Sequence, residues 1–346
     1  MTQPPPPDSA APTPDSPRPM PDAPGSVPRT PSPLSGTPAP ARNTPRAWAE
    51  LLRVSALFTV PGDALAGAAV LGARPGRTTA LAVGASLCLY EAGMALNDWA
   101  DRDEDAVDRP HRPIPSGRVS PPAALAAAGA LTVAGVALAA RAGRPAFAVS
   151  TALAATVWSY DLHLKHTVAG PVAMGAARSL DLLLGATATA GAAPGAGGGA
   201  VRAALPAAAA LGVHTAAVTT VSRREAHGGS TALPLAALAV TGAIGTLLGR
   251  RRPKSSGTAR TAGPAGPRAL TAGLAAAYAA TAGRPLLHAA LNPSPPLTQR
   301  AVGGGIRAMI PLQGALAARG GAAGVALGVM ALAPLARTVA RKVSPT

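Results

Sequence analysis

The sequence predicts an all-α membrane protein that crosses the bilayer several times, folded as a bundle of about nine transmembrane helices. Apolar residues make up 48% of the 346 residues and come in long runs without charge. A run of about 18 apolar residues is long enough to cross the hydrocarbon core. The polar residues gather in segments between these runs. Helices are expected because lipid offers no partners for backbone polar groups.

Five spans are expected in the first half of the chain. Pro61 interrupts the first span and is expected to kink it, because proline removes a helical hydrogen bond. Pro121 suits the first turn of the third span, where its missing N–H is not needed. These five spans lie at about residues 48–70, 78–96, 121–140, 145–160 and 168–190.

The second half is expected to add four spans, of which the last is the least regular. The sixth and seventh flank the polar segment 222–229, and the eighth follows a basic loop. The four spans lie at about residues 203–221, 231–249, 269–280 and within 302–340. One helix and an extra turn are expected in the last of these regions. The membrane domain is therefore expected over residues 46–340, with a short tail at 341–346.

Residues 1–45 are expected to form a disordered or polyproline-like tail, because they hold 16 of the 38 prolines and almost no large apolar residues. The net charge of +16 does not indicate nucleic-acid binding, because the basic residues stand singly between apolar runs and aromatic residues make up only 2%. Membrane loops and anionic headgroups account for this charge better. We expect a multi-pass protein of the cell membrane, with lipids and not nucleic acid as its partners.

The most unusual segment is acidic, since six of the 15 acidic residues fall within residues 98–108. If the second helix continues past Asn97, then Asn97, Asp101 and Asp105 follow at steps of about 40° and share a face. An amide and two carboxylates are oxygen ligands suited to Mg²⁺, which adds substrate phosphate to its shell. The alternative is a solvated acidic loop. The position at the mouth of a membrane helix favours a site, because carboxylates there are costly unless used.

Two segments resemble the motifs of UbiA-type membrane prenyltransferases, and together they place the resemblance over roughly residues 46–340. The first aspartate motif is matched by Asn97-Asp98-x-x-Asp101-x-x-x-Asp105, then Arg109, Arg112-Pro113 and Gly117. The family's Tyr/Lys motif is matched by Tyr160-Asp161-x-x-Leu164-Lys165. The segment GPVAMGAARSLDLLLG, at residues 170–185, is similar to the EboC-like branch of the superfamily.

This resemblance implies a UbiA-like helical bundle and the transfer of a prenyl group from a prenyl diphosphate to an unidentified acceptor. It implies Mg²⁺ held by Asn97, Asp101 and Asp105. It implies diphosphate binding by Arg109, Arg112 and Lys165, whose side chains suit phosphate oxygens. The Tyr160 ring could stabilise an allylic cation through its face. The expected catalytic residues are Asp101, Asp105, Lys165 and Tyr160.

The second aspartate motif of the family, after the sixth span, is incomplete in this sequence. Val221 stands in place of the first Asp and Glu225 in place of the second, and no acidic residue follows Glu225. One interpretation is that Arg223 or Arg224 contacts the diphosphate in place of a second cation, with Glu225 as a remaining metal ligand. The other interpretation is a changed substrate or no transfer activity.

Two alternatives to an enzyme stay open. The first is a non-catalytic or transport-linked UbiA-like membrane protein that binds a lipid or isoprenoid. The second, an ion transporter, ranks last because most carboxylates cluster at one mouth instead of spreading through the spans. Four ionisable residues do lie within the spans, namely Asp63, Glu91, Arg178 and Asp181. Of these, Arg178 and Asp181 are three apart on one helix and are expected to pair.

Overall fold

The computed structural model describes residues 44–53, 59–191, 196–226, 228–250 and 266–343. These residues are helical almost throughout and contain no β-strand, so the all-α prediction is confirmed. The expected proline-rich tail falls outside them, except for its last two residues. The helices are α1 (Pro45–Leu51), α2 (Pro61–Val70), α3 (Arg77–Ala100), α4 (Arg102–Asp108), α5 (Pro121–Ala142), α6 (Arg144–Ser159), the π-helical turn η2 (Tyr160–Leu164), α7 (Gly170–Ala190), α8 (Ala196–Ser222), α9 (Ala232–Gly249), α10 (Gly266–Leu291), α11 (Pro295–Arg319) and α12 (Ala323–Val343).

The expected first span is two separate helices, and the prediction of a single kinked helix was wrong. α1 ends at Leu51, and α2 begins at Pro61, in the first helical turn where proline is tolerated. α1 buries Ala47 and Leu51 in a cluster that includes Leu96 of α3. This contact holds α1 beside the end of α3 that carries the acidic segment.

The C-terminal region also differs from the prediction. The expected single helix within 302–340 is two helices, because α11 ends at Arg319 and α12 begins at Ala323. The helix expected at 269–280 is the longer α10. Both α10 and α11 contain internal prolines, at Pro285 and Pro311. Helices packed inside a membrane bundle tolerate such prolines because neighbouring groups satisfy the freed backbone.

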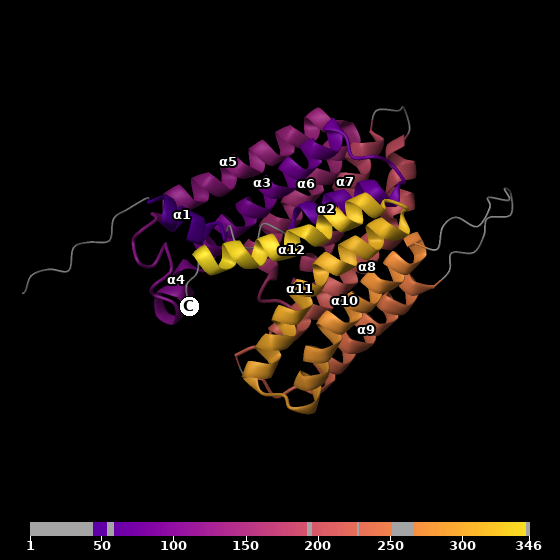
Figure 1. The fold of residues 1–346 in the computed structure, drawn as a ribbon. Coiled ribbons are helices and arrows are strands. Elements are labelled where there is room, and N and C mark those ends of the chain that lie inside the picture. Colours follow the sequence, from indigo (N-terminus) through magenta and orange to yellow (C-terminus); the bar gives the residue numbers. More distant parts are fainter. Residues whose placement is uncertain (1–43, 54–58, 192–195, 227, 251–265, 344–346) are drawn as a thin grey trace, which may run out of the picture. The chain divides into compact units, whose positions relative to one another are not determined.

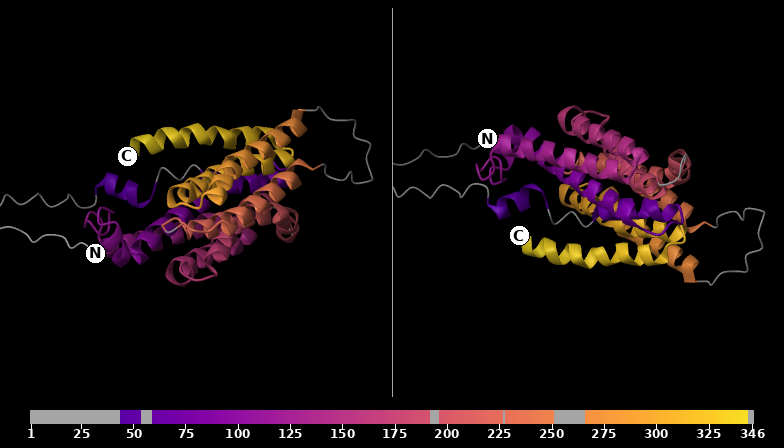
Figure 2. Two further views of the ribbon diagram at one scale, coloured as in Figure 1. Left: turned by 90° about the horizontal axis from the view of Figure 1, so that it is seen from below. Right: turned by 90° about the horizontal axis from the view of Figure 1, so that it is seen from above.

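Two helices, α2 and α7, lie in the middle of the bundle. On one side they pack against α3 and α6, and on the other against α8 and α11 (Figure 1). Two views at right angles to this one place α12 along one edge and the α5–α6 pair along the opposite edge (Figure 2). Side chains of both central helices can therefore meet residues from either half of the bundle.

The central helices approach each other closely through glycines. A Cβ atom added to Gly67 of α2 would lie 2.0 Å from the carbonyl oxygen of Leu182, and one added to Gly185 of α7 would lie 2.0 Å from that of Ala64. Small residues at such contacts let membrane helices pack backbone to backbone. The contact also sets Asp63, beside Ala64, near the α7 residues that line the cavity described below.

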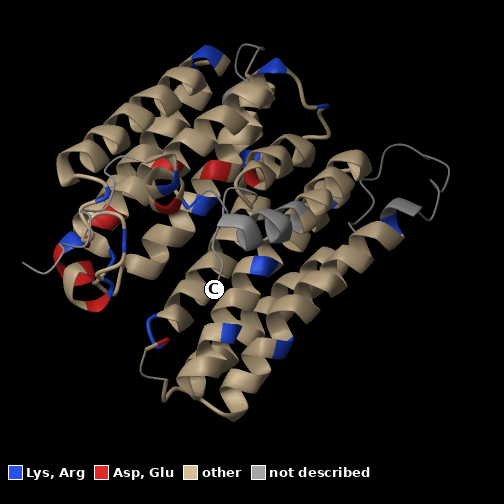
Figure 3. Cartoon of the chain, turned by 60° about the vertical axis from the view of Figure 1, so that its left-hand side comes forward, with Lys and Arg blue, Asp and Glu red and all other residues tan. Residues whose placement is uncertain are grey.

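Four helices among the described residues have the length and apolarity of a membrane span, namely α3, α5, α8 and α9. α7, α10 and α11 are 21, 26 and 25 residues long and so have sufficient length. The chain is therefore a multi-pass membrane protein. Most acidic segments lie at one end of the bundle and a smaller group lies inside it (Figure 3). The first group surrounds α4, and the second belongs to α2, α3 and α7.

Candidate active site

The acidic segment does not form one continuous helix. α3 ends at Ala100, and Asp101 leaves helical geometry with φ −90° and ψ 5° before α4 begins. The spacing of four residues survives this break. The Asp101 N–H donates to the Asn97 carbonyl over 2.9 Å, and the Asp105 N–H donates to the Asp101 carbonyl over 2.8 Å. The three predicted ligands therefore still follow one another turn by turn.

Two contacts join the aspartate motif to the Tyr/Lys motif, about sixty residues later. The Asn97 side-chain nitrogen donates to Asp161 Oδ1 over 3.0 Å. The ammonium of Lys165 contacts the Asp101 carboxylate. η2 helps to place Lys165, because its N–H bonds five residues back to the Tyr160 carbonyl. Such π-turns are frequent at functional sites.

Burial perturbs the acid of η2. Asp161 is buried, and this burial raises the pKa of its carboxyl to about 6, although the Asn97 hydrogen bond and the Lys165 charge act in the opposite direction. The side-chain nitrogen of Asn97 donates to Asp161, so the side-chain oxygen Oδ1 is the Asn97 atom that can bind a cation.

The predicted phosphate-binding arginines are held by buried carboxylates. Arg112 Nη1 lies 2.6 Å from Asp105 Oδ2 and 3.4 Å from Asp98 Oδ1. Arg109 adds a contact of 3.3 Å to Asp105, and Arg53 adds one of 3.1 Å to Asp98. The Asp105 side chain is only 1% exposed. Asp105 therefore holds two arginines, Arg109 and Arg112. Asp98, which the helical-face argument did not include, belongs to the same network through Arg112.

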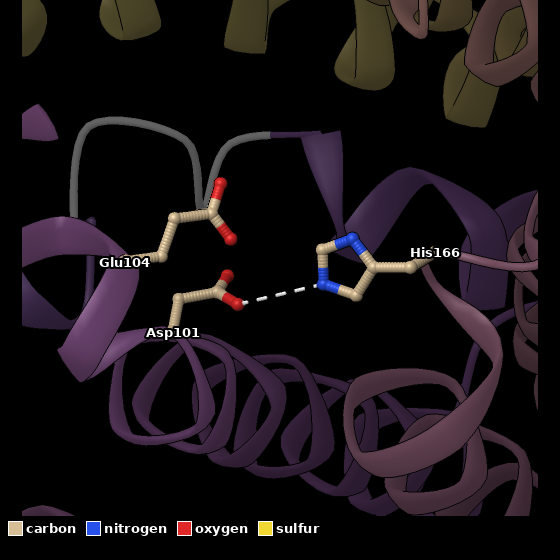
Figure 4. Close-up of side chains that lie close together, drawn as sticks. All are labelled: Asp101, Glu104 and His166. Atoms are coloured by element: carbon tan, nitrogen blue, oxygen red, sulfur yellow. Dashed lines mark ion pairs between the residues drawn. The ribbon is translucent and has the colours of Figure 1, made fainter.

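A group of metal-competent side chains lies beside these contacts (Figure 4). Ligand atoms of Asp101, Glu104 and His166 lie within 4.8 Å of one another. Asp101 Oδ1 is 4.0 Å from His166 Nε2, the interaction drawn in Figure 4. Sequence reasoning missed Glu104 and His166. The available signals were that Glu104 lies three residues after Asp101 and that His166 follows Lys165.

The incomplete second motif lies at the end of α8, close to the other two. Arg223 donates from Nη1 to the Thr167 carbonyl over 2.6 Å and from Nη2 to the His166 carbonyl over 3.2 Å. Arg223 therefore ties α8 to the segment that follows Lys165. Arg224 is exposed and makes no side-chain hydrogen bond or ion pair within the described part of the chain. Burial raises the pKa of Glu225, and the nearby Arg109 charge opposes that shift.

A cavity of about 260 Å³ leads from this mouth into the bundle. Its outer end is lined by Arg53, Asn97, Tyr160 and Asp161. Its inner end is lined by Ser86, Arg178 and Asp181. A larger cavity of about 510 Å³ lies between α8, α9 and α11, but it is lined almost wholly by apolar residues and by none of the motif residues. We therefore assign the chemistry to the smaller cavity.

The expected ion pair between Arg178 and Asp181 is replaced by other pairings. Arg178 Nε lies 3.0 Å from Asp63 Oδ2, and the Ser86 hydroxyl donates to Asp181 Oδ2 over 2.7 Å. Asp63 comes from α2, so the partner lies more than a hundred residues away. The expected pairing of residues three apart considers one helix alone. Because α2 packs against α7, Asp63 of α2 is close enough to pair with Arg178 instead. Glu91, also on α3, does not line the cavity.

Comparison with known proteins decides the family of the chain. The model of the UbiA prenyltransferase family matches residues 55–248, more than half of the sequence. The chain belongs to the UbiA prenyltransferase family. A digeranylgeranylglyceryl phosphate synthase from Methanopyrus kandleri is 38% identical over 127 residues, which are 35% of this chain and 45% of the relative. The chain spans about half the length of the curated relatives it matches.

Solved structures of UbiA homologues show the same fold. The apo homologue from Aeropyrum pernix has a TM-score of 0.58 and 19% identity, covering 75% of this chain and 96% of that one. A homologue from Archaeoglobus fulgidus, described as bound to GPP and Mg²⁺, has a TM-score of 0.52 and 16% identity, covering 80% and 99%. The UbiA bundle expected from the sequence motifs is thus confirmed.

Proposed function

We propose that this chain is a Mg²⁺-dependent prenyltransferase of the cell membrane, which moves an isoprenoid group from a prenyl diphosphate to an acceptor. The observation that carries this proposal is the meeting of three motifs at one cavity mouth. Asp101 contacts Lys165, Asn97 bonds Asp161, and Arg223 joins the end of α8 to the same segment. Carboxylates that suit a divalent cation thus lie beside positive side chains that suit a diphosphate.

The donor set fits a divalent cation. Asn97, Asp101 and Glu104 offer oxygen atoms at the mouth, and His166 offers a ring nitrogen. Mg²⁺ binds one or two carboxylates and takes phosphate oxygens as further ligands. When bound, it would neutralise charge on the departing diphosphate. Asp105 and Glu225 stay predicted ligands, and Asp105 would first have to release Arg109 and Arg112.

The side chains of the chain supply the rest of the chemistry. Arg109, Arg112, Lys165 and Arg224 hold the diphosphate at the mouth, and Arg223 holds the segment that carries Lys165. The bond between the allylic carbon and the diphosphate oxygen breaks, and its electron pair leaves with the diphosphate. The allylic cation then forms a bond with the acceptor, which releases a proton. Positive side chains stabilise the charge that develops on the leaving group.

Tyr160 has a separate part in this proposal. It lines the outer end of the cavity, where the allylic carbon would lie. The face of its ring attracts positive charge. In this proposal, the Tyr160 ring faces the allylic cation. Assignment of the chain to the EboC-like branch stays a prediction.

A non-catalytic isoprenoid-binding protein is the second candidate. Val221 in place of an acidic ligand favours it, because a two-metal site then lacks an oxygen donor. The two functions differ in whether diphosphate is released. Purified protein in lipid nanodiscs would receive geranyl, farnesyl or geranylgeranyl diphosphate with Mg²⁺ and a lipid extract as the source of acceptor.

The transferase predicts release of diphosphate by the wild type and by Asp103→Asn, and little release by Asp101→Asn. Asp103 is a matched control because it lies on α4, two residues after Asp101, and its side chain is 87% exposed. Wild-type release no faster than that of Asp101→Asn, with every prenyl chain, would support the binding protein instead.

A further inference from the structure

The inner end of the cavity carries a second polar group, separate from the motifs at the mouth. Ser86 of α3 and the α7 residues Arg178 and Asp181 line it. Ser86 lies eleven residues before Asn97, or about 16 Å along the helix axis. The wall between the two ends is mainly apolar, with Leu89, Leu153, Val157, Met174 and Ala177. The cavity is therefore polar at both ends and apolar between them.

Two side chains near this inner end are joined by a hydrogen bond. Gln313 of α11 donates from Nε2 to Asp63 Oδ1 over 2.6 Å, and both side chains are fully buried. Asp63 Oδ2 lies 3.0 Å from Arg178 Nε as an ion pair, without the alignment of a hydrogen bond. Asp63 therefore helps to hold the guanidinium of Arg178 in place.

Other atoms of the cluster keep unused hydrogen-bonding capacity. Asp181 is only 5% exposed, and its Oδ2 atom accepts from the Ser86 hydroxyl. The Asp181 carboxyl also interacts with that of Asp63, and its Oδ1 atom has no other hydrogen-bond partner among the described residues. Within the described part of the chain, the terminal nitrogen Nη2 of Arg178 has one hydrogen-bond contact, to the sulfur of Met309 at 3.7 Å. A buried polar atom without a partner is rare and costly, above all inside a membrane bundle. Donors and an acceptor thus face the same cavity end.

The balance of charge selects the class of ligand. One guanidinium already faces two carboxyl groups, those of Asp63 and Asp181. A carboxylate or phosphate placed there would lie beside both acids. An apolar prenyl tail would leave Arg178 Nη2 without an oxygen acceptor and Asp181 Oδ1 without a donor beyond Asp63. A neutral hydroxyl can accept from Arg178 and donate to Asp181 at the same time.

We propose that Ser86, Arg178 and Asp181 form a subsite for a neutral hydroxyl group of the acceptor. The acceptor is then an elongated molecule with its nucleophile near Tyr160, an apolar body along the wall and a hydroxyl at the inner end. This inference rests on the proposed function, because the ligand is an acceptor only if the chain transfers a prenyl group. Binding at the subsite itself can be measured without turnover.

The test compares four probes of similar size in wild-type nanodiscs: cyclohexanol, methylcyclohexane, cyclohexanecarboxylate and cyclohexylammonium. Saturation-transfer NMR measures binding, and the same nanodiscs without protein correct for partition into lipid. Cyclohexanol is expected to bind most tightly. Methylcyclohexane binding equally well, or the carboxylate or ammonium binding better, would overturn the subsite.

A variant then locates the binding. Asp181→Leu keeps the approximate shape and removes the acceptor oxygen, so cyclohexanol should bind about tenfold more weakly, as expected for one lost hydrogen bond to a buried polar group. Methylcyclohexane binding should not weaken. Unchanged cyclohexanol binding would contradict the proposal. If this variant fails to fold, the order of the four wild-type probes still decides.

The outcome is separable from that of the proposed function. Selective cyclohexanol binding without diphosphate release from any prenyl substrate would leave the subsite standing and remove the transferase. Diphosphate release with no preference among the four probes would leave the transferase standing and remove the subsite.

Discussion

The ammonium of Lys165 contacts the carboxylate of Asp101, although the two residues belong to different motifs and follow different helices, η2 and α3. Lys165 is 10% exposed and Asp101 is 20% exposed, so the pair lies at the mouth with limited contact to solvent. In the proposed reaction, Asp101 binds the cation and Lys165 binds the anion of one diphosphate. The predictions below follow from this arrangement and from the packing that supports it.

Lys165→Met should lower the rate of diphosphate release by roughly a hundredfold, because one preorganised positive group is lost from the leaving-group site. Lys165→Arg should retain part of the rate, since it keeps the charge with a different shape. His163→Ala is the matched control, because His163 is exposed on the same π-turn. A Lys165→Met enzyme as fast as the control would remove Lys165 from the site.

Arg223→Ala and Arg224→Ala should differ in kind. Arg223 holds the carbonyl groups of His166 and Thr167, so its loss should loosen the segment and make it exchange amide hydrogens faster. Arg224 makes no such bond, so its loss should weaken prenyl diphosphate binding without changing exchange there. Hydrogen exchange read by mass spectrometry, together with the Michaelis constant for the diphosphate, separates the two. Identical exchange in both variants would refute the division of roles.

Arg112→Met should destabilise the fold by about 3–5 kcal/mol, because it leaves the buried carboxylates of Asp98 and Asp105 without their shared partner. Arg46→Met is the control, since Arg46 forms an exposed pair with Glu50, of a kind worth about 0–1 kcal/mol. The midpoint of thermal unfolding in one detergent measures both. Equal midpoints for the two variants would show that the buried network does not stabilise the mouth.

Gly185→Val should lower stability by about 1–3 kcal/mol or more, since its side chain would force α7 away from Ala64 of α2. Gly242→Val tests the same substitution on α9, where an added Cβ meets no atom within 4 Å. Thermal unfolding followed by tryptophan fluorescence compares them. A Gly185 variant as stable as the Gly242 variant would contradict the close contact of the central helices.

The sequence predicted the all-α bundle because apolar run length follows from bilayer thickness. The count of about nine spans stays a prediction, since four of the described helices combine the length and apolarity of a span. It also brought Asn97 and Asp101 into one site, because a spacing of four residues survives the small break between α3 and α4. It failed at Pro61, where a helix starts instead of bending, since sequence alone does not separate these two uses of proline.

Contacts between distant segments account for the remaining differences. Arg178 was expected to pair within α7, but Asp63 from α2 takes its place. His166 was not expected as a metal-competent residue, because its proximity to Asp101 depends on how the turn after α6 packs against α3. Local periodicity carries no information on either contact.

The central claim is that Asp101 holds a cation that binds the diphosphate. Farnesyl thiodiphosphate, whose bridging sulfur resists ionisation, allows binding to be measured by calorimetry in nanodiscs without turnover. With Mg²⁺ the wild type and Asp103→Asn should bind it tightly, and with chelator they should bind it weakly.

Asp101→Asn reverses part of this pattern and is the most direct test. Without metal it should bind at least as well as the wild type, because a negative charge beside Lys165 has been removed. With Mg²⁺ it should gain little affinity, because the cation has lost a carboxylate ligand. Equal strengthening by Mg²⁺ in the wild type and in Asp101→Asn would contradict the account.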